Sequence, residues 1–340
     1  MPPPIFINNI VFLCASASPR ENAINPTNPK HDKIENMYKM IDNWAIIPDT
    51  PSGRENGRTH GVCVTSTGNV IVFHQAQDGL LTFDPDGKLI SATGGDRWLG
   101  AHGLTKVVEN GTEYLWLTDQ VSKEVAKVNL AGETMQTINQ PDHAAYADGG
   151  KYVPTWAAVN PANGDIWVTD GYGSSLVHRY DQSGKYLSTI DGTEGAGRFA
   201  CPHGINFRQG ADGVELWITD RSNKRIVIYD GDGNYQRKST LTHSPCCFDF
   251  LDSQVVIPEL FTGVKVLNVN SLELITELGA NDIISPDERP EGWPNLAGTD
   301  LLRPNLLNSP HGACFAPNGD IYCVEWIIGG RISRFVKSTF

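Results

Sequence analysis

The sequence lacks any apolar stretch of about 18 residues, the shortest length typical of a membrane-spanning helix. It is also poor in basic residues, because 27 Lys and Arg stand against 39 Asp and Glu, which gives a net charge of −12. Most of such a surface would repel a polyanion such as nucleic acid. We therefore expect neither a membrane span nor a nucleic-acid partner, and the oligomeric state stays open.

Paired cysteines are also missing. The seven cysteines form no CxxC motif and are too few for a disulfide scaffold in a chain of 340 residues. Most of them are expected to be buried packing residues. Cys63 and Cys314 occupy the same position in two copies of a repeat, where packing is the simpler interpretation and a disulfide is the alternative.

The sequence does contain an internal repeat. Each copy has an apolar run, a turn and a second β-rich run, which in most copies ends on an acidic residue. A composition with 34 Gly and 21 Pro suits many short strands joined by tight turns. Six copies of one such unit predict an all-β fold, a six-bladed β-propeller. The copies are residues 60–74, 102–119, 154–170, 202–220, 245–259 and 310–326.

The two ends of the chain are expected to close the ring. Five copies continue into a third and a fourth strand, but the last is followed only by residues 331–336. The isolated strand-like run at residues 43–48 can supply the missing outer strand and so remove an exposed sheet edge. The predicted layout is a leader at residues 1–42 and a propeller at residues 43–340.

Three segments fall outside the repeat. Residues 5–17 form a short apolar run that ends in an A-x-A pattern, as a secretory signal does, although two asparagines interrupt it. A secreted or periplasmic location is favoured, and a cytoplasmic one stays open. The insertions at residues 139–153 and 279–309 both lead into an innermost strand, so we expect them over the same end of the channel, as lids or as disordered loops.

Four of the nine histidines precede a glycine, and each stands at the start of a predicted innermost strand. Since innermost strands line the channel, the four imidazoles are expected to converge at one end of the axis. His102, His203 and His311 lie on alternate blades, about 120° apart, and three histidines with one open position are typical of catalytic zinc. His60 could support these ligands or act as a fourth ligand, and four imidazoles would suit iron.

Other polar residues of the repeat have simpler interpretations. His-Gly could be only a repeat-consensus feature, with the imidazole bonded to a neighbouring blade's backbone. Asp119, Asp170 and Asp220 end the second strands of successive blades and are expected to accept backbone N–H bonds in the following turn. Four of the other five histidines follow no position of the repeat: His74, His143, His178 and His243.

These features resemble the lyase domain of the peptidylglycine α-amidating enzymes, a six-bladed propeller of NHL-type repeats. The resemblance covers roughly residues 60–336. Its most specific parts are the openings AHGL, CPHG and SPHG and the segments at residues 154–186 and 218–230. It implies a zinc ion held by three histidines, a tyrosine base and an arginine facing the site. The corresponding residues here are His102, His203 and His311 for the metal, Tyr172 for the base and Arg221 for the arginine.

The resemblance also implies a reaction. The family's substrate is a peptide that ends in α-hydroxyglycine, and it splits into a peptide amide and glyoxylate. We therefore expect a zinc-dependent lyase that cleaves a C–N or C–O bond at a hydroxylated carbon of a peptide or small molecule. Tyr172, with an ordinary pKa of about 10, would need the metal and Arg221 to act as a base at neutral pH. Alternatively, Tyr172 is a plain strand-end aromatic and Arg221 pairs with Asp220 or Asp170.

Three positions depart from the family pattern. Gly312 stands where the family has an aspartate of a calcium site, which speaks against calcium. Gln75 replaces an arginine that we would expect to take the substrate carboxylate, and Gly173 replaces a half-cystine. Gln75 and Arg58 are the substrate-binding candidates. Two other functions stay open: a metal-dependent hydrolase or lactonase on the propeller axis, and a noncatalytic NHL-type propeller that binds a protein or glycan.

Overall fold

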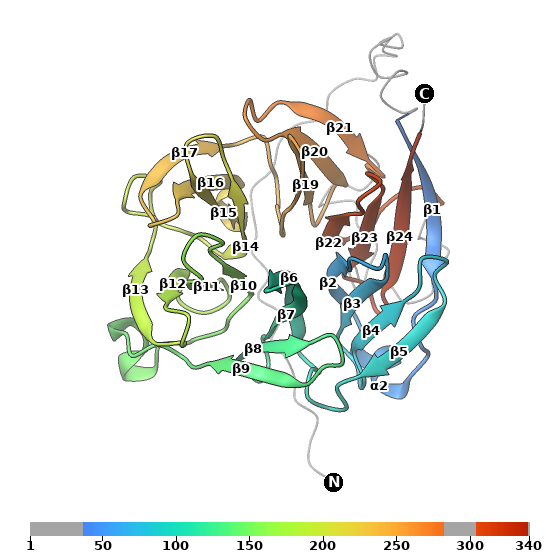
Figure 1. Ribbon diagram of the computed structural model, residues 1–340, viewed down its shortest axis with the longest axis horizontal. Helices are drawn as coiled ribbons and strands as arrows, with labels where there is room; N and C mark the ends of the chain where they lie inside the picture. Colours follow the sequence, from blue (N-terminus) through green and yellow to red (C-terminus); the bar gives the residue numbers. More distant parts are fainter. Residues whose placement is uncertain (1–36, 282–303, 339–340) are drawn as a thin grey trace, which may run out of the picture.

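The computed structural model describes residues 37–281 and 304–338. It confirms the predicted six-bladed β-propeller: six antiparallel four-stranded sheets surround a central axis, each with its first strand innermost (Figure 1). The signal-like run at residues 5–17 lies outside the described residues, as do most of the expected leader and most of the insertion at residues 279–309.

The first three blades follow the chain in order. Blade one contains β2 (Thr59–Val64), β3 (Val70–His74), β4 (Leu80–Phe83) and β5 (Leu89–Thr93). Blade two contains β6 (Ala101–Glu109), β7 (Thr112–Asp119), β8 (Glu124–Asn129) and β9 (Thr134–Ile138). Blade three contains β10 (Trp156–Val159), β11 (Ile166–Asp170), β12 (Leu176–Tyr180) and β13 (Tyr186–Ile190).

The last three blades complete the ring. Blade four contains β14 (Pro202–Gln209), β15 (Val214–Asp220), β16 (Arg225–Asp230) and β17 (Tyr235–Ser239). Blade five contains β18 (Asp249–Leu251), β19 (Gln254–Pro258), β20 (Val264–Asn268) and β21 (Leu274–Leu278). Blade six contains β22 (Pro310–Phe315), β23 (Ile321–Glu325), β24 (Arg331–Lys337) and, from the other end of the chain, β1 (Tyr38–Ala45).

The closing strand β1 lies where the ring needs it, but its predicted bounds were wrong. It spans Tyr38–Ala45 and pairs antiparallel with β24, whereas residues 46–48 are not in a strand. The pairing register shifts between Ile41 and Ala45, where Asn43 has a φ of 47°. This irregularity interrupts the alternation of polar and apolar residues, which is why the sequence pattern indicated only the second half of the strand.

Tryptophans of the second strands pack between neighbouring blades. Trp116, Trp167 and Trp217 occupy equivalent positions in β7, β11 and β15 and are almost fully buried. Trp167 belongs to a hydrophobic cluster with residues of blade four, and Trp217 to one with residues of blade five. These tryptophans therefore hold blades two, three and four each against the blade that follows.

Most of the described cysteines are buried, as expected. Six of them are free thiols, and five of those six are buried. Cys63 and Cys314 are both free, so the alternative of a closing disulfide was wrong. Cys14 lies outside the described residues.

The acids that end the second strands are structural, as predicted. Asp119 accepts backbone N–H bonds from Val121 and Ser122 in the following turn, and also from Gly100 before the innermost strand. Asp170, Asp220, Glu259 and Glu325 accept comparable bonds in the next four blades. Blade one places His74 at this position, so the expectation that His74 follows no position of the repeat was wrong.

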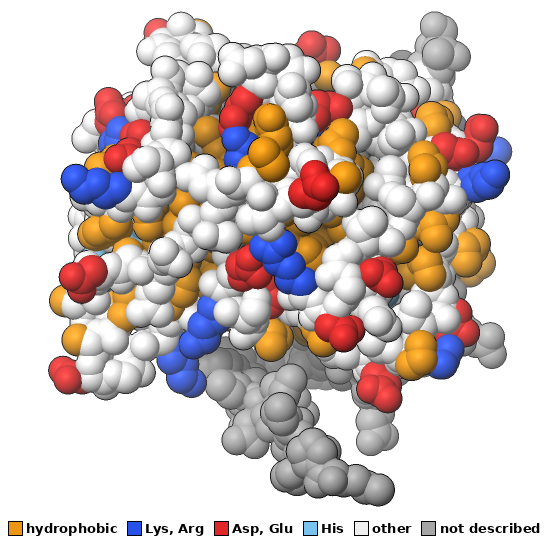
Figure 2. All heavy atoms as spheres, turned by 60° about the horizontal axis from the view of Figure 1, so that its bottom comes forward, with side chains coloured by type: hydrophobic (Ala, Val, Ile, Leu, Met, Phe, Trp, Pro, Cys, Tyr) orange, Lys and Arg blue, Asp and Glu red, His pale blue; other side chains and the backbone are white. Residues whose placement is uncertain are grey.

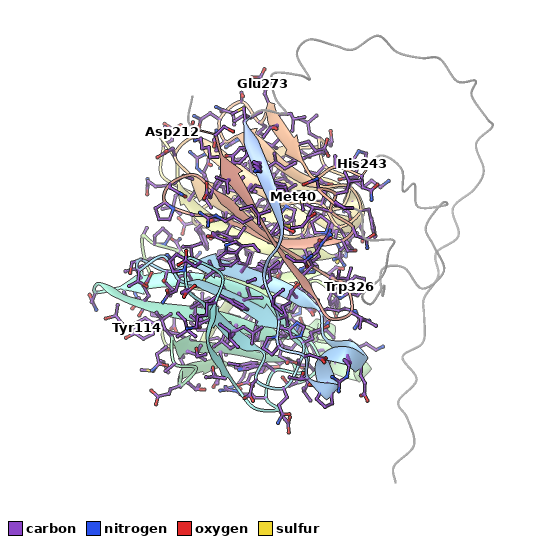
Figure 3. The ribbon with its side chains drawn as sticks, turned by 90° about the vertical axis from the view of Figure 1, so that its right-hand side faces the viewer. Met40, Tyr114, Asp212, His243, Glu273 and Trp326 are labelled. Carbon is purple, nitrogen blue, oxygen red and sulfur yellow. The ribbon has the colours of Figure 1, made fainter. Side chains whose placement is uncertain are left out.

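The two faces of the ring differ in what they carry. Figure 3 shows Trp326 and His243 on one face and Tyr114 and Asp212 on the opposite face. The described ends of both insertions lie on the face of Trp326. Val153, from the first insertion, donates its N–H to Asp170, and Asn308, from the second, donates its N–H to Glu325. Asp170 and Glu325 occupy equivalent positions in their blades. The short helices α2 (Pro51–Asn56) and η1 (Ala144–Gly149) were not predicted.

The surface shows no concentration of one charge on the side presented in Figure 2, where acidic, basic and apolar side chains are interspersed. Within residues 37–281 and 304–338, no helix has the length and apolar character to cross a bilayer.

Candidate metal centre

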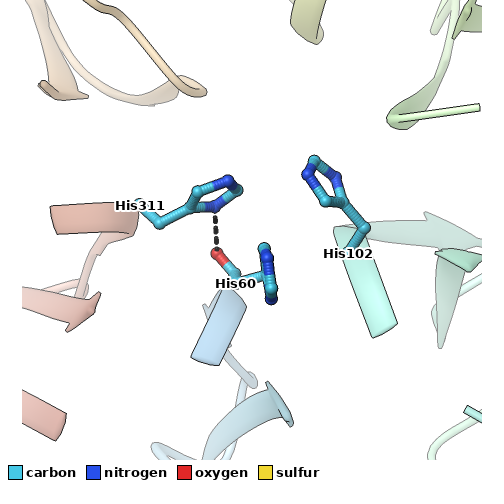
Figure 4. A group of neighbouring side chains, drawn as sticks. All are labelled: His60, His102 and His311. Atoms are coloured by element: carbon cyan, nitrogen blue, oxygen red, sulfur yellow. Dashed lines mark hydrogen bonds between the residues drawn. The ribbon is translucent and has the colours of Figure 1, made fainter. Parts of the chain in front are cut away.

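The four histidines that precede glycine converge on the axis, as predicted. Each is the second residue of an innermost strand: His60 in β2, His102 in β6, His203 in β14 and His311 in β22. All four side chains are almost completely buried. Figure 4 shows three of the rings, those of His60, His102 and His311, turned toward one another at the centre of the ring.

One nitrogen of each ring on the even-numbered blades faces a backbone carbonyl of the next blade. His102 Nδ1 lies 2.7 Å from Thr155 O, and His203 Nδ1 lies 2.7 Å from Cys246 O. His311 Nδ1 lies 3.3 Å from His60 O, the contact drawn in Figure 4. Because a carbonyl only accepts, each Nδ1 carries the proton and each Nε2 keeps its lone pair.

The same carbonyls explain the glycine after each of these histidines. A Cβ on Gly103 would lie 2.6 Å from Thr155 O, and one on Gly204 would lie 2.2 Å from Cys246 O. On Gly312 it would lie 2.2 Å from His60 O. Only glycine allows the neighbouring carbonyl to come close enough to hold the imidazole.

The rings lie within reach of a common ion. Ring centroids are 4.7 Å apart for His102 and His203, and 4.9 Å apart for His311 and each of these two. His60 joins the group, at 4.7 Å from His102 and 4.4 Å from His311. Two sets of three potential ligand atoms lie within 4.8 Å of one another: His60, His102 and His311, and His203, Cys246 and His311. Sequence reasoning missed Cys246.

Burial sets the charge of the cluster. It lowers the pKa of His102 to about 3. Burial, and after it the charge of neighbouring imidazoles and arginines, lowers the pKa of His60, His203 and His311 well below the ordinary value of 6.5. All four imidazoles are therefore neutral at neutral pH, the form in which histidine binds metal ions.

Tyr172 and Arg221 lie at the cluster, as the resemblance implied. The Tyr172 hydroxyl is 3.1 Å from His102 Nε2 and 3.0 Å from His203 Nε2, and Arg221 Nη2 donates to it at 3.2 Å. Burial raises the pKa of Tyr172 to about 12, against the opposing charge of Arg221. The alternative, in which Arg221 pairs with Asp220 or Asp170, is not observed among the described residues. Arg225 pairs with Asp220 at 2.6 Å, and Asp170 accepts the Tyr146 hydroxyl at 2.8 Å.

The cluster has more hydrogen-bond acceptors than donors, and a bound cation would satisfy the excess acceptors. The Tyr172 hydroxyl has one proton, yet it faces two Nε2 atoms that both need one. His311 Nε2 is buried without any hydrogen-bond partner among the described residues. Unpaired lone pairs in a buried site are costly unless something positive binds them. A metal ion would satisfy all of these nitrogens at once.

The turn that carries Tyr172 is held by the insertion at residues 139–153. Asp170 accepts the backbone N–H groups of Val153 at 2.6 Å and Ser174 at 2.7 Å, and the Tyr146 hydroxyl at 2.8 Å. Tyr146 also contacts His178 Nε2, at 2.5 Å. Tyr146 and His178 carry no motif in the sequence, and only the folded chain shows that they support the Tyr172 turn.

The two substrate-binding candidates lie side by side near His60. Gln75 N–H donates to Arg58 O at 2.9 Å. The Arg58 guanidinium lies over the Trp326 ring, 5.4 Å from its centroid, and this ring is 6.5 Å from that of His60. A pocket of about 300 Å³ is lined by later residues of the innermost strands, including Ala313 and Phe315, and so lies farther along the axis.

The fold and the site together define a class, a six-bladed propeller of NHL-type repeats with an axial histidine cluster. No family model matches the chain. The chain is 25% identical over 216 residues to the peptidylglycine alpha-amidating monooxygenase of Rattus norvegicus, covering 52% of this chain and only 21% of that protein. It is 26% identical over 235 residues to the probable peptidyl-alpha-hydroxyglycine alpha-amidating lyase pgal-1 of Caenorhabditis elegans, covering 59% and 63%.

A third relative is the human NHL repeat-containing protein 3, 24% identical over 216 residues, or 58% of this chain and 57% of that protein. These relatives confirm the predicted resemblance to the amidating lyases and to NHL-repeat proteins, at low identity.

Solved structures of similar fold have different activities, so they do not indicate which reaction this chain catalyses. A virginiamycin B lyase of Staphylococcus aureus has a TM-score of 0.56 at 14% identity and covers 88% of this chain and 100% of its own. A gluconolactonase of Xanthomonas campestris has a TM-score of 0.60 at 12% identity, covering 91% and 93%. At such identities the likeness shows only the propeller fold.

Proposed function

We propose that this protein is a metal-dependent lyase that cleaves the C–N bond of an α-hydroxyglycine compound and releases glyoxylate. The observation that best supports this proposal is the axial cluster. There, His102 and His203 are neutral and turn their unprotonated Nε2 atoms toward the Tyr172 hydroxyl, which also contacts Arg221. The relative from Caenorhabditis elegans, named as a probable peptidyl-alpha-hydroxyglycine alpha-amidating lyase, supports the same reaction. The signal-like run at residues 5–17 supports a secreted or periplasmic location within this proposal.

The metal would be zinc, held by His102, His203 and His311 through their Nε2 atoms. Neutral imidazoles suit zinc, and a donor set without carboxylates does not suit calcium. Zinc, when bound, supplies Lewis acidity that lowers the pKa of a hydroxyl group. His60 supports the ligands in this proposal, and a fourth imidazole ligand would favour iron instead.

Tyr172 would take the proton of the substrate hydroxyl. With a pKa raised to about 12, its phenol is protonated at neutral pH in the metal-free protein. The positive charge of Arg221 and of a bound cation would favour the phenolate. Once the hydroxyl proton is removed, the electron pair left on the oxygen forms the second C–O bond of glyoxylate. The C–N bond breaks, its electron pair leaves with the amide nitrogen, and the proton passes to that nitrogen.

The substrate carboxylate would bind Arg58. The resemblance places a family arginine at position 75, where this chain has Gln75, but the two positions are joined by a backbone hydrogen bond. The guanidinium of Arg58 lies against Trp326, whose ring is 6.5 Å from that of His60, and its Nη1 donates to Asn56 O at 3.0 Å. Arginine binds carboxylates through two parallel hydrogen bonds, which would also orient the hydroxylated carbon.

The first test is elemental analysis of the purified protein beside His203→Ala, followed by an assay of glyoxylate release from an α-hydroxyglycine peptide. We expect one zinc ion per chain in the wild type. The His203→Ala variant should lose both the zinc and the activity. His243→Ala is the matched control, because His243 is exposed. It should keep both metal and activity.

Other outcomes would replace this function. One iron per chain would indicate that His60 also ligates. A metal-containing protein that hydrolyses lactones and releases no glyoxylate would be a lactonase. If the wild type stays metal-free even after incubation with zinc, the lyase proposal fails and a noncatalytic binding propeller is the better account.

A further inference from the structure

Cys246 is a buried thiol beside the histidine cluster that the proposed lyase reaction does not use. It lies three residues before β18, the innermost strand of blade five, at the position where blade one has His60 and blade three has Thr155. The carbonyls of all three residues accept the Nδ1 contacts described above. At this position, then, blade one points an imidazole into the cluster and blade five offers a thiol.

The backbone of Cys246 is fixed on both sides. Its N–H donates to Pro258 O at 2.9 Å, and its carbonyl lies 2.7 Å from His203 Nδ1. Among the described residues, the thiol contacts Ser244 O at 3.6 Å and Pro310 O at 3.9 Å, and the Arg221 guanidinium lies beside it. By contrast, the hydroxyl of Thr155 is engaged with Thr169 Oγ1 at 2.9 Å. The two carbonyl contacts of the Cys246 sulfur are therefore weaker than the hydroxyl contact of Thr155.

The distances fit a shared ion. Cys246 Sγ and one ring nitrogen each of His203 and His311 lie within 4.8 Å of one another, and all three side chains are buried. Nitrogen and sulfur ligands of a tetrahedral zinc ion lie roughly 3.3 to 3.8 Å apart, given bond lengths of about 2.0 to 2.3 Å. Movements of about 1 Å would suffice. The unpartnered His311 Nε2 provides an independent indication of a ligand here.

We propose that Cys246 is a metal ligand, so that the axial centre is a mixed nitrogen and sulfur site built from His203, His311 and Cys246 with the remaining imidazoles. The inference rests on the proposed metal site and extends it to the ligand chemistry. On binding, the thiol loses its proton to solvent and the thiolate donates to the metal. Thiolate favours zinc or another soft divalent ion over calcium and magnesium.

The test uses Co²⁺ as the probe, because a thiolate ligand to Co²⁺ produces a sulfur-to-metal charge-transfer band in the near ultraviolet. We expect this band in the wild type, in proportion to the bound cobalt. Cys246→Ser should lose the band and still bind cobalt through its histidines. Cys247→Ser is the matched control, since this neighbouring buried thiol contacts His311 O, at 3.6 Å, and the backbone of Ala313, and it should keep the band.

A second measurement needs no variant. X-ray absorption of the zinc-loaded wild type should show one sulfur scatterer at about 2.3 Å beside nitrogen neighbours. A shell of nitrogen and oxygen alone, or a cobalt band that survives Cys246→Ser, overturns the inference and leaves the proposed histidine site intact. A wild type that binds neither cobalt nor zinc overturns both.

Discussion

At the scale of single residues, the His-Gly pairs combine two interpretations that the sequence presented as alternatives. The imidazoles of the even blades do bond a neighbouring blade's backbone, but only through Nδ1. The opposite nitrogen, Nε2, faces the axis, where the Tyr172 hydroxyl lies near two of the three rings. A consensus feature of the repeat therefore also orients the histidines as a metal site would require.

Tyr172→Phe tests the proposed base. The change removes one oxygen that contacts His102, His203 and Arg221 and leaves the ring in place. Glyoxylate release should fall by about 100-fold or more, the usual effect of losing a general base. Zinc content should stay at the wild-type level, because the imidazoles hold the ion.

Tyr186→Phe is a suitable control for that change, since among the described residues the Tyr186 hydroxyl hydrogen-bonds Thr189 Oγ1, at 2.8 Å, on the outer strand of blade three. Unchanged activity of Tyr172→Phe would show that another group takes the proton. Loss of zinc would instead show that the Tyr172 hydroxyl helps to hold the metal.

At the scale of elements, the closing strand β1 is what makes the six sheets a ring. It covers the edge of β24, and Tyr38 joins a hydrophobic cluster that includes Phe335. Without it, the backbone groups of β24 would be exposed as an unpaired edge, which favours aggregation.

Deleting residues 1–45 should therefore destabilise the whole propeller, whereas a chain that begins at Met37 keeps the strand. We expect the shorter chain to lose about 3 kcal/mol of its free energy of unfolding, the order expected when two buried side chains are removed, and to aggregate at lower temperature. Urea unfolding and light scattering of the two truncated chains measure this. Equal stability would mean that β24 needs no partner.

At the scale of the whole molecule, buried neutral histidines make stability depend on pH. Burial lowers the pKa to about 3 for His102, about 4 for His74 and about 3 for His178. In the unfolded chain the pKa of each histidine would return to about 6.5. At a pH between its folded and unfolded pKa values, each histidine is therefore neutral in the folded state and protonated in the unfolded state. The unfolded state thus binds more protons below pH 6.5, and stability falls as the pH falls.

The metal-free protein should hence be most stable above pH 6.5 and lose stability steadily between pH 6.5 and 4. Each such histidine contributes about 1.4 kcal/mol per pH unit within its window. Burial raises the pKa of Asp249 to about 6 and also raises the pKa of Asp170 and Asp220. These three carboxyl groups act in the opposite direction, against six histidines whose pKa burial lowers. Urea unfolding at pH 7, 6 and 5 with a chelator measures the slope, and His178→Gln should make it shallower. A flat profile would contradict neutral, buried histidines.

The sequence by itself determined the number of blades, the ring closure by the N-terminal segment and the convergence of four histidines, because each repeat records its own strands and turns. Tyr172 and Arg221 followed from a motif resemblance. Local patterns could not place the start of β1, since its pairing is irregular around Asn43.

Only the tertiary structure brought Cys246 to His203 and His311, and Tyr146 to Asp170. These contacts join separate blades or an insertion to a blade, and no periodicity within the chain encodes them. Repeat patterns specify what each blade is, whereas the closed ring decides which side chains meet on its axis.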